Sequence, residues 1–490
     1  MRTIIILTVT LPIIAGVLLP ALKLQNRRIK LGLMIAALAA EFALVLVMAA
    51  EGCADFTVWK LTNTLFVSFR ADGITKIFTI FTSAIWLLVG LYSCVYMKHE
   101  QSEDRFFAFY LLSESMLIGM DVAGNLFTLY MFYEGLTLMA LPLVLHTLKK
   151  EAIAAAVKYL FYSIGGAFMA LFGMLVINHY AVTLEFIPGG SLDVTRIAGH
   201  EKLILIAVFV AMVGFGTKAG MYPMHGWLPA AHPVAPAPAS AVLSAVIAKG
   251  GVLAIIRILY YNVGADFIAG TWVQKALLSL ALLTIFMGSM MAYRTKVLKT
   301  RLAYSTVSQI SYVLLGVFLL SAEGLMAGLL HTVYHATIKT ALFLSAGIII
   351  YYTGRTHVDN MRGIGKETPI TLWSFTMASL ALIGIPPASG FISKWALAMT
   401  SLGSGLAVFS WLAPVILLIS ALLTAGYLLP ISITGFFPGK DYIPSAPRIR
   451  PEKDPLMWAP VLVIAILTIA LGLWSSDLVS WLTEVARLSM

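Results

Sequence analysis

The sequence predicts an all-α, polytopic membrane protein, because both its composition and the length of its apolar runs are typical of a chain that crosses a bilayer many times. Hydrophobic residues make up 60% of the 490 residues and charged residues only 11%, whereas soluble domains carry about 25% charged residues. The mean hydropathy is +0.91. A transmembrane helix needs about 20 mainly apolar residues, and the chain divides into about fourteen such spans.

The expected spans are separated by charged residues and by Pro/Gly clusters. They begin near Thr3, Leu31, Asp72, Phe106, Gly124, Glu151, Leu203, Pro238, Trp272, Leu302, Glu323, Pro369, Trp411 and Leu456. The first run has no small-residue cleavage site, so we expect it to be a retained helix rather than a signal peptide.

Loop charges predict the orientation. Lys and Arg gather in alternate loops, among them 23–30, 294–301 and 437–454, and these loops are expected on the cytoplasmic side. Both termini are then outside. The net charge of +10 mostly reflects this bias, and it indicates contacts with anionic lipids and partner subunits rather than nucleic acid.

Ionisable residues inside the apolar runs are the main candidates for a functional site. Lys218, Lys249, Lys339 and Lys394 lie inside or against such runs, and Glu134 lies inside another. A charged residue at mid-membrane depth costs about 2.5 to 3.5 kcal/mol on insertion scales. A set of them therefore predicts a path for charge. For Lys394 the alternative is a side chain that reaches the interface and anchors its helix.

A histidine ladder adds to this path. His331, His335 and Lys339 follow at i, i+4 and i+8, so they share one helix face. Histidine can give and accept a proton near neutral pH, and burial disfavours the charged form of a nearby lysine. Two alternative roles remain for the histidines. They could donate hydrogen bonds to helix carbonyls, or they could bind a metal ion, although the ladder lacks a third strong ligand for one.

Glu134 must either pair with a charged residue of another helix or be protonated, since its own helix carries no other charged residue. Lys218 is the expected partner, in a pair that acts either as a protonation switch or as a static contact between helices. Secondary candidates are Lys158, His225 and Asp121.

The chain also contains a weak internal repeat. Lys158 and Lys339 lie in similar contexts, and the next marked lysines, Lys218 and Lys394, both lie beside Gly/Pro clusters that should break their helices. Paired broken helices indicate a transport site at a repeat interface. We expect four parts: N-terminal helices in 1–105, repeats in 106–260 and 261–437, and a loop with the last helix in 438–490.

Redox chemistry is not expected in this chain. Only Cys53 and Cys94 are present, too few for an iron–sulfur cluster or a thiolate zinc site. No cofactor or metal is predicted here, and iron–sulfur, nickel or flavin groups would belong to partner subunits.

Three segments carry a resemblance: TKAGMYPMHGWLPAAHPVAPAPASAVLSAVIAKGG, LLHTVYHATIKTALFLSAG and GIPPASGFISKW. They resemble the antiporter-like subunits shared by respiratory complex I, Mrp sodium/proton antiporters and membrane-bound hydrogenases. The resemblance covers about 72–427. It implies fourteen helices, two inverted five-helix repeats and breaks in helices seven and twelve.

The same resemblance gives the site residues roles. It implies a Glu134/Lys218 pair, a central relay of Lys249, His331, His335 and Lys339, and a terminal Lys394. The expected function is proton translocation, with sodium coupling open, by a D-type subunit of a multisubunit complex in a prokaryotic cell membrane. The alternatives are a self-sufficient antiporter, a complex I subunit of similar length, and a structural anchor.

Overall fold

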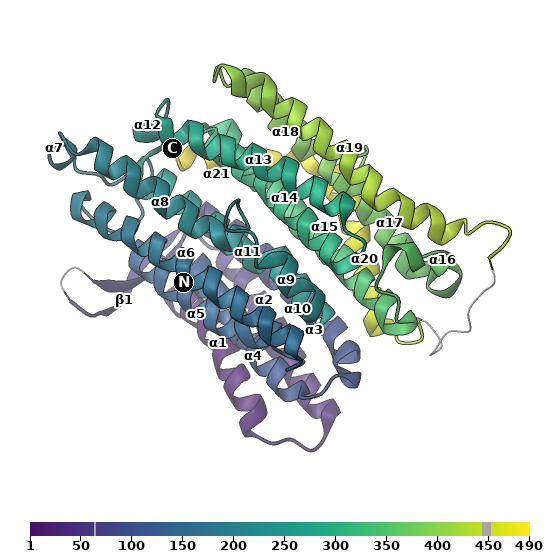
Figure 1. The fold of residues 1–490 in the computed structure, drawn as a ribbon. Helices are drawn as coiled ribbons and strands as arrows, with labels where there is room; N and C mark the ends of the chain where they lie inside the picture. The colour runs from purple at the N-terminus through teal and green to yellow at the C-terminus, as the bar shows by residue number, and fades with distance from the viewer. Residues whose placement is uncertain (63–64, 443–451) are drawn as a thin grey trace.

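The computed structural model describes residues 1–62, 65–442 and 452–490. Its first part contains α1 (Arg2–Ala21), α2 (Arg27–Ala50), β1 (Ala54–Lys60), β2 (Phe66–Ala71), α3 (Gly73–Tyr96), η1 (Met97–His99), α4 (Glu103–Asp121), α5 (Leu126–Val144), α6 (Lys150–Tyr180), α7 (Val194–Ile197) and α8 (Glu201–Ala219). Figure 1 shows the long helices running side by side in one bundle.

The middle of the chain contains α9 (Leu228–Val234), α10 (Ala237–Val242), η2 (Leu243–Ile247), α11 (Ala248–Ile256), η3 (Arg257–Val263), α12 (Ala265–Ile268), α13 (Trp272–Arg294), α14 (Leu298–Phe318) and α15 (Ala322–Thr353). The last part contains η4 (Val358–Asn360), α16 (Ile364–Glu367), α17 (Pro369–Ile383), α18 (Ser389–Gly403), α19 (Val408–Phe436), α20 (Pro455–Leu473) and α21 (Ser475–Leu488). Part of the positively charged loop 437–454 lies outside the described residues.

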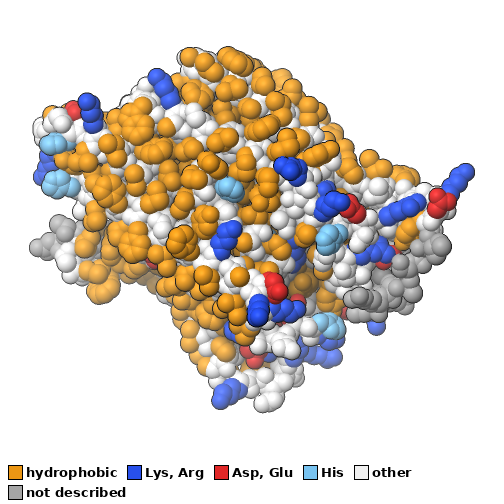
Figure 2. Space-filling model, viewed as in Figure 1, with side chains coloured by type: hydrophobic (Ala, Val, Ile, Leu, Met, Phe, Trp, Pro, Cys, Tyr) orange, Lys and Arg blue, Asp and Glu red, His pale blue; other side chains and the backbone are white. Residues whose placement is uncertain are grey.

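The membrane character of the fold is as predicted. Among the described residues, eleven helices are long and apolar enough to cross a membrane, and Pro369–Ile383 is a shorter apolar helix. The helices begin within a few residues of the expected starts. Because α4, α14 and the α17/α18 pair are not among the eleven, the count of fourteen crossings stays a prediction. Figure 2 shows apolar side chains covering the middle of one face, with most of its Lys and Arg at the lower right.

The all-α prediction missed a β-hairpin between α2 and α3. Strands β1 and β2 pair antiparallel, with Phe56 opposite Phe69 and Asp55 opposite Arg70. The segment is rich in β-branched and aromatic residues on both sides of the turn, which favours strands. The two strands are short, however, and lie between long apolar runs, so the sequence analysis did not predict them. The hairpin, α7, α12 and the C-terminus lie at one end of the bundle (Figure 1), called here the hairpin end. The opposite end, which carries α16, is the loop end.

Two helices are interrupted where the sequence predicts breaks. Helix α8 ends at Gly220, whose φ of 74° is left-handed, and the chain resumes as a helix at α9. Helix α17 ends at Gly384, with φ 91°, and α18 continues it from Ser389. Glycine adopts this conformation without the steric cost that a Cβ brings. Each interruption leaves backbone carbonyls that polar side chains can reach.

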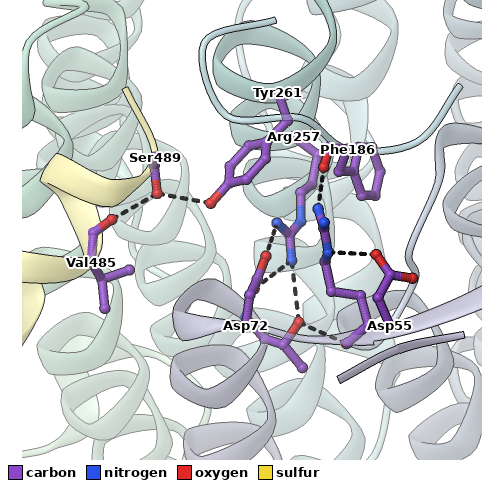
Figure 3. Close-up of polar contacts among 9 residues, drawn as sticks. Asp55, Asp72, Phe186, Arg257, Tyr261, Val485 and Ser489 are labelled. Carbon is purple, nitrogen blue, oxygen red and sulfur yellow. Dashed lines mark hydrogen bonds and ion pairs between the residues drawn. The ribbon is translucent and has the colours of Figure 1, made fainter. Parts of the chain in front are cut away.

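A partly buried ion pair joins two segments at the hairpin end (Figure 3). Arg257 on η3 donates to both carboxylate oxygens of Asp72, at 2.7 and 2.9 Å, and Asp72 also caps α3 through the Thr75 amide. The guanidinium lies 5.0 Å from the Phe186 ring centre and 4.7 Å from that of Tyr261. The pair therefore joins two distant segments of the chain.

This ion pair predicts acid-sensitive stability. Burial alone would raise the pKa of Asp72, but the charge and hydrogen bonds of Arg257 lower it to about 2, against about 3.9 in an unfolded chain. The depressed pKa contributes about 2 kcal/mol above pH ~4, and this contribution is lost as the pH falls from about 4 to about 2. We expect Asp72→Asn to lower the unfolding temperature in detergent at pH 7. Near pH 2 the unfolding temperatures of the variant and the wild type should become similar. A constant difference across this range would contradict the assignment.

Candidate functional site

Lys218 lies at the end of α8, directly before the interruption. It is 3% exposed, and its ammonium donates to Thr137 Oγ1 at 2.9 Å and to the Tyr133 carbonyl at 3.4 Å. The Tyr133 ring centre is 4.3 Å away. Trp227 fixes the other side of the break by donating to the Thr217 carbonyl at 2.8 Å. The lysine is thus held by neutral oxygens and an aromatic face of α5.

Glu134 and Lys218, the expected partners, do not form an ion pair in the structure. Among the ion pairs of the described residues, none joins them. Glu134 is partly buried on α5, beside the two residues that hold the lysine, and the two charges are close enough to interact. The physical reason is helical geometry: 133 and 137 share the face toward Lys218, whereas 134 points about 100° away from 133.

Lys249 lies in α11, between the π-helical segments η2 and η3. It is fully buried, and its ammonium donates to the Ser244 carbonyl at 2.6 Å. Widened π turns leave carbonyls free and occur often at functional sites. The charges of His335 and Lys339 are close enough to act on Lys249 or to be acted on by it. The three residues therefore form a central group between α11 and α15.

The histidine ladder is on one buried face of α15, as its spacing predicts. The His331 and His335 rings stack with centres 6.0 Å apart, and His331 Nδ1 lies 2.9 Å from Ser393 Oγ on α18. His331 Nε2 and both ring nitrogens of His335 have no hydrogen-bond partner among the described residues. No group of three metal-ligating side chains occurs in the same part of the chain. Three of the four ring nitrogens are therefore buried without a hydrogen-bond partner among the described residues.

Lys339 completes the ladder on α15. Its ammonium donates to the Leu302 carbonyl at 3.0 Å and to Ser305 Oγ at 2.7 Å, both on α14. Ser305 in turn accepts a hydrogen bond from the Tyr427 hydroxyl at 2.8 Å. Lys339 is fully buried, and both oxygens that accept its hydrogen bonds lie on α14.

Lys394 lies on α18, just after the second interruption. Its ammonium donates to the carbonyls of Leu382 and Ile383, at 2.5 and 3.1 Å, which end the broken helix α17. Tyr312 stands between the lysine and the ladder: its ring centre is 5.2 Å from the Lys394 ammonium and 5.3 Å from the His331 ring. No pattern in the sequence singles out Tyr312, because aromatic residues are common in apolar runs.

The secondary candidates are placed differently. Lys158 is exposed on α6, and His225 is partly exposed in the segment between α8 and α9, with its ring 5.8 Å from Tyr222. Asp121 is fully buried near the end of α4, apart from the lysines. Lys158 is therefore a surface residue rather than a member of the buried row.

Two buried residues that the sequence reasoning missed lie near the central group. His232 on α9 is fully buried with its ring stacked on Phe343 at 4.7 Å. The positive-inside rule places Lys299 in a cytoplasmic loop, but it is 6% exposed in the first turn of α14 and donates to the Ala235 carbonyl at 2.8 Å. The sequence feature that could have predicted the burial of Lys299 is its position directly before an apolar run.

The five buried lysines share one kind of partner. Lys218, Lys249, Lys299, Lys339 and Lys394 donate to carbonyl or hydroxyl oxygens, and none is in an ion pair of the described residues. Neutral acceptors satisfy an ammonium group without fixing its charge, whereas a buried carboxylate would resist its deprotonation. The five ammonium groups are thus satisfied by neutral oxygens, without an ion-pair partner among the described residues.

Comparison with known proteins decides the family. The family described as "NADH:quinone oxidoreductase/Mrp antiporter, TM" matches residues 123–425. The chain belongs to this family. A second family, "NADH-Ubiquinone oxidoreductase (complex I), chain 5 N-terminus", matches residues 61–107.

Relatives of this NADH:quinone oxidoreductase/Mrp antiporter family member come from both kinds of complex. The N subunit of the NADH-quinone oxidoreductase of Desulforudis audaxviator is 32% identical over 85% of this chain and 83% of that protein. The D subunit of the Na(+)/H(+) antiporter of Bacillus subtilis is 29% identical over 87% and 84%. A chain of the Mrp complex from Dietzia sp. has the same fold, with a TM-score of 0.85, 23% identity and 99% and 97% coverage. The chain is thus an antiporter-like membrane subunit, as its motifs predict.

Proposed function

We propose that this chain translocates protons, with sodium coupling as a variant, as the D-type subunit of a multisubunit cell-membrane complex. The proposal rests on the buried row of lysines and histidines. The lysine ammonium groups donate to neutral oxygens on α5, η2, α14 and α17, and Lys218 and Lys394 lie beside the two interruptions. The proton would pass from Lys218 to Lys249, through the His331/His335/Lys339 ladder, and to Lys394. Glu134 would act on Lys218 through space rather than by direct contact.

The proposal includes the finer architecture. Fourteen crossings would be arranged as two inverted five-helix repeats in 106–260 and 261–437, with both termini outside. The paired interruptions at Gly220 and Gly384 support this arrangement, since transport sites are built where such breaks meet. Redox cofactors would reside in partner subunits, and anionic lipids would contact the cytoplasmic loops.

A second candidate is the proton-pumping subunit of similar length in complex I. The chain is 32% identical to the N subunit of NADH-quinone oxidoreductase, which supports this candidate. It is also 29% identical to the D subunit of the Na(+)/H(+) antiporter, and the difference between these two identities is too small to choose between the candidates. Purification of the native complex, with identification of its subunits, separates the two. Nickel or iron–sulfur subunits would favour an oxidoreductase, and a set of small membrane subunits alone would favour an Mrp antiporter.

Lys339→Ala tests the relay itself. Because Lys339 is fully buried between α14 and α15, we expect proton transport by the reconstituted complex to fall by about tenfold or more, which is a barrier increase of about 1.4 kcal/mol or more. The measurement is dye-monitored acidification of vesicles. Lys275→Ala is the matched control, since Lys275 is exposed on α13. Equal transport in both variants would contradict the relay.

A further inference from the structure

A polar cavity of about 340 Å³ lies at the loop end, between the start of α4 and the start of α6. Its walls come mainly from two connecting segments, one that joins α3 to α4 and one that joins α5 to α6. Arg105 and Lys149 line it with cationic groups, and Glu100 is the one carboxylate among its lining residues. The cavity therefore has an excess of positive charge at an end of the bundle that the positive-inside rule predicts to face the cytoplasm.

His146 is a buried lining residue whose ring lacks hydrogen bonds. It is 3% exposed, and neither ring nitrogen has a hydrogen-bond partner among the described residues. The backbone of Gln101, which also lines the cavity, is near enough to act on the ring but forms no hydrogen bond of normal geometry with it. Burial and the charge of Arg105 lower the pKa of His146 to about 4. The ring is therefore neutral at pH 7 and offers one N–H.

Arg105 adds a second buried donor beside the histidine. Its Nη2 donates to the His146 carbonyl at 2.5 Å, which holds the guanidinium against this wall. Its Nε is buried and has no hydrogen-bond partner in the described part of the chain. Buried polar groups are rarely left without a partner. Two such groups on neighbouring lining residues therefore indicate a ligand that accepts hydrogen bonds.

Two long helices begin at the cavity. Ser102 directly precedes α4 and Lys149 directly precedes α6; both line the cavity, and neither caps its helix with a side-chain hydrogen bond. The first amides of a helix have no partner within it, and they form the positive end of the helix dipole. Glu103 and Asp104, in the first turn of α4, form ion pairs with α2 instead, and Glu151 of α6 is exposed and does not line the cavity. Both helix ends therefore add to the positive potential.

A phosphate group fits these donors. Helix N-termini and arginine side chains bind phosphate in many proteins, because amide and guanidinium N–H groups donate to its oxygens. A metal ion does not fit, since the charged groups of the wall are mostly cationic. The chemistry of the cavity thus selects an anion that accepts several hydrogen bonds.

The rim of the cavity indicates where this phosphate comes from. Leu148 lines the cavity and is 54% exposed. Ile153 lies one turn beyond Lys149, and with Val157 and Phe161 it forms an exposed apolar face of α6. An exposed apolar face of this kind is typical of a surface that contacts lipid or another protein. A phosphate that carries an acyl chain fits both the cavity and this face, whereas free phosphate fits the cavity alone.

We propose that this cavity binds the phosphate group of an anionic phospholipid, with an acyl chain along the exposed face of α6. Arg105, the His146 N–H, Lys149 and the first amides of α4 and α6 hold the phosphate. A headgroup without an amine is preferred, because an amine would lie beside two cationic side chains. The site gives a specific place to the lipid contacts of the proposed function and does not need the lysine relay, so lipid binding and proton transport are tested separately.

A photoreactive leucine analogue in place of Leu148 tests the site in the intact complex. The complex is reconstituted in vesicles with equal amounts of phosphatidylglycerol and phosphatidylcholine and irradiated, and mass spectrometry identifies what is attached to the chain. We expect phosphatidylglycerol adducts to exceed phosphatidylcholine adducts by about tenfold, as for one charge-assisted hydrogen bond to phosphate. Added inorganic phosphate should leave this ratio unchanged.

Three variants locate the binding energy. Lys149→Glu should remove the preference for phosphatidylglycerol, because it puts a carboxylate on the wall of the cavity. Lys150→Glu is the matched control, since it makes the same charge change on the next residue, which does not line the cavity; an acidic residue at a helix N-terminus does not destabilise the helix. His146→Phe keeps the ring size and loses the N–H, so it should weaken the preference without lowering the unfolding temperature in lipid-free detergent.

Several results would overturn the proposal. Equal labelling of the two lipids, or equal effects of Lys149→Glu and Lys150→Glu, would show only a general attraction of the surface for anionic lipid. Loss of the lipid adducts in inorganic phosphate would assign the cavity to a free anion. Attachment to a partner subunit instead of lipid would show that this face is a protein contact. These readouts include the complex without substitutions in the wall, so they do not depend on how the variants fold.

Discussion

Lys218→Ala is expected to eliminate proton translocation while the complex still assembles. The side chain ends at the α8 interruption, where its ammonium group donates to Thr137 Oγ1 and to the Tyr133 carbonyl. Alanine removes the proton carrier, and helix α8 loses only one buried chain at its last turn. Dye-monitored pumping in inverted vesicles measures the effect. Wild-type rates in this variant would exclude Lys218 from the path.

Lys218→Arg separates charge from proton transfer. Guanidinium keeps the positive charge beside Thr137 and Tyr133 but does not release its proton at accessible pH. We therefore expect this variant to be as inactive as Lys218→Ala. Restored pumping would show that the position requires only a positive charge.

Glu134→Gln tests whether the carboxylate acts on Lys218 without touching it. We expect a large loss of coupling, because removing its charge changes the field at the lysine. The double variant with Lys218→Ala should lose little more than Lys218→Ala alone, since two members of one switch fail together. Multiplicative losses would show that the residues act separately.

The sequence predicted the spans and interruptions because these depend on local properties. Long apolar runs start helices wherever they occur, and Gly220 and Gly384 end them because only glycine adopts φ values of 74° and 91° without strain. The ladder His331, His335, Lys339 is also local, since a single helix fixes its face. These features follow from spacing along the chain alone.

Features that depend on packing between helices were predicted less well. Opposite charge makes Lys218 the expected partner of Glu134, but the face of α5 that meets the ammonium group carries Tyr133 and Thr137. The positive-inside rule places Lys299 in a loop because it counts charges without regard to the helix that buries them. The depth of a residue at the end of a span is set by its neighbours, which the sequence alone does not place.

Lys394 has a structural alternative that the sequence did not suggest. Its ammonium donates to the carbonyls of Leu382 and Ile383 at the end of α17, which is what a lysine that caps a helix C-terminus does. In the proposed path the same lysine takes a proton from the ladder, past Tyr312, and releases it outward. Capping needs only the positive charge, whereas proton release needs a group that can lose it.

Lys394→Arg decides between these roles, and Lys394→Met serves as the variant without the charge. Lys394→Met keeps a side chain of similar size but removes the positive charge. It should stop turnover if Lys394 carries the proton, and also if Lys394 is an essential helix cap. Lys394→Arg keeps a donor for the α17 carbonyls but cannot release a proton, so we expect thermal stability near that of wild type with transport abolished. Transport by the reconstituted complex and its unfolding temperature are measured together. Arginine at wild-type activity would leave Lys394 only its cap, because a permanently charged side chain cannot carry the proton outward.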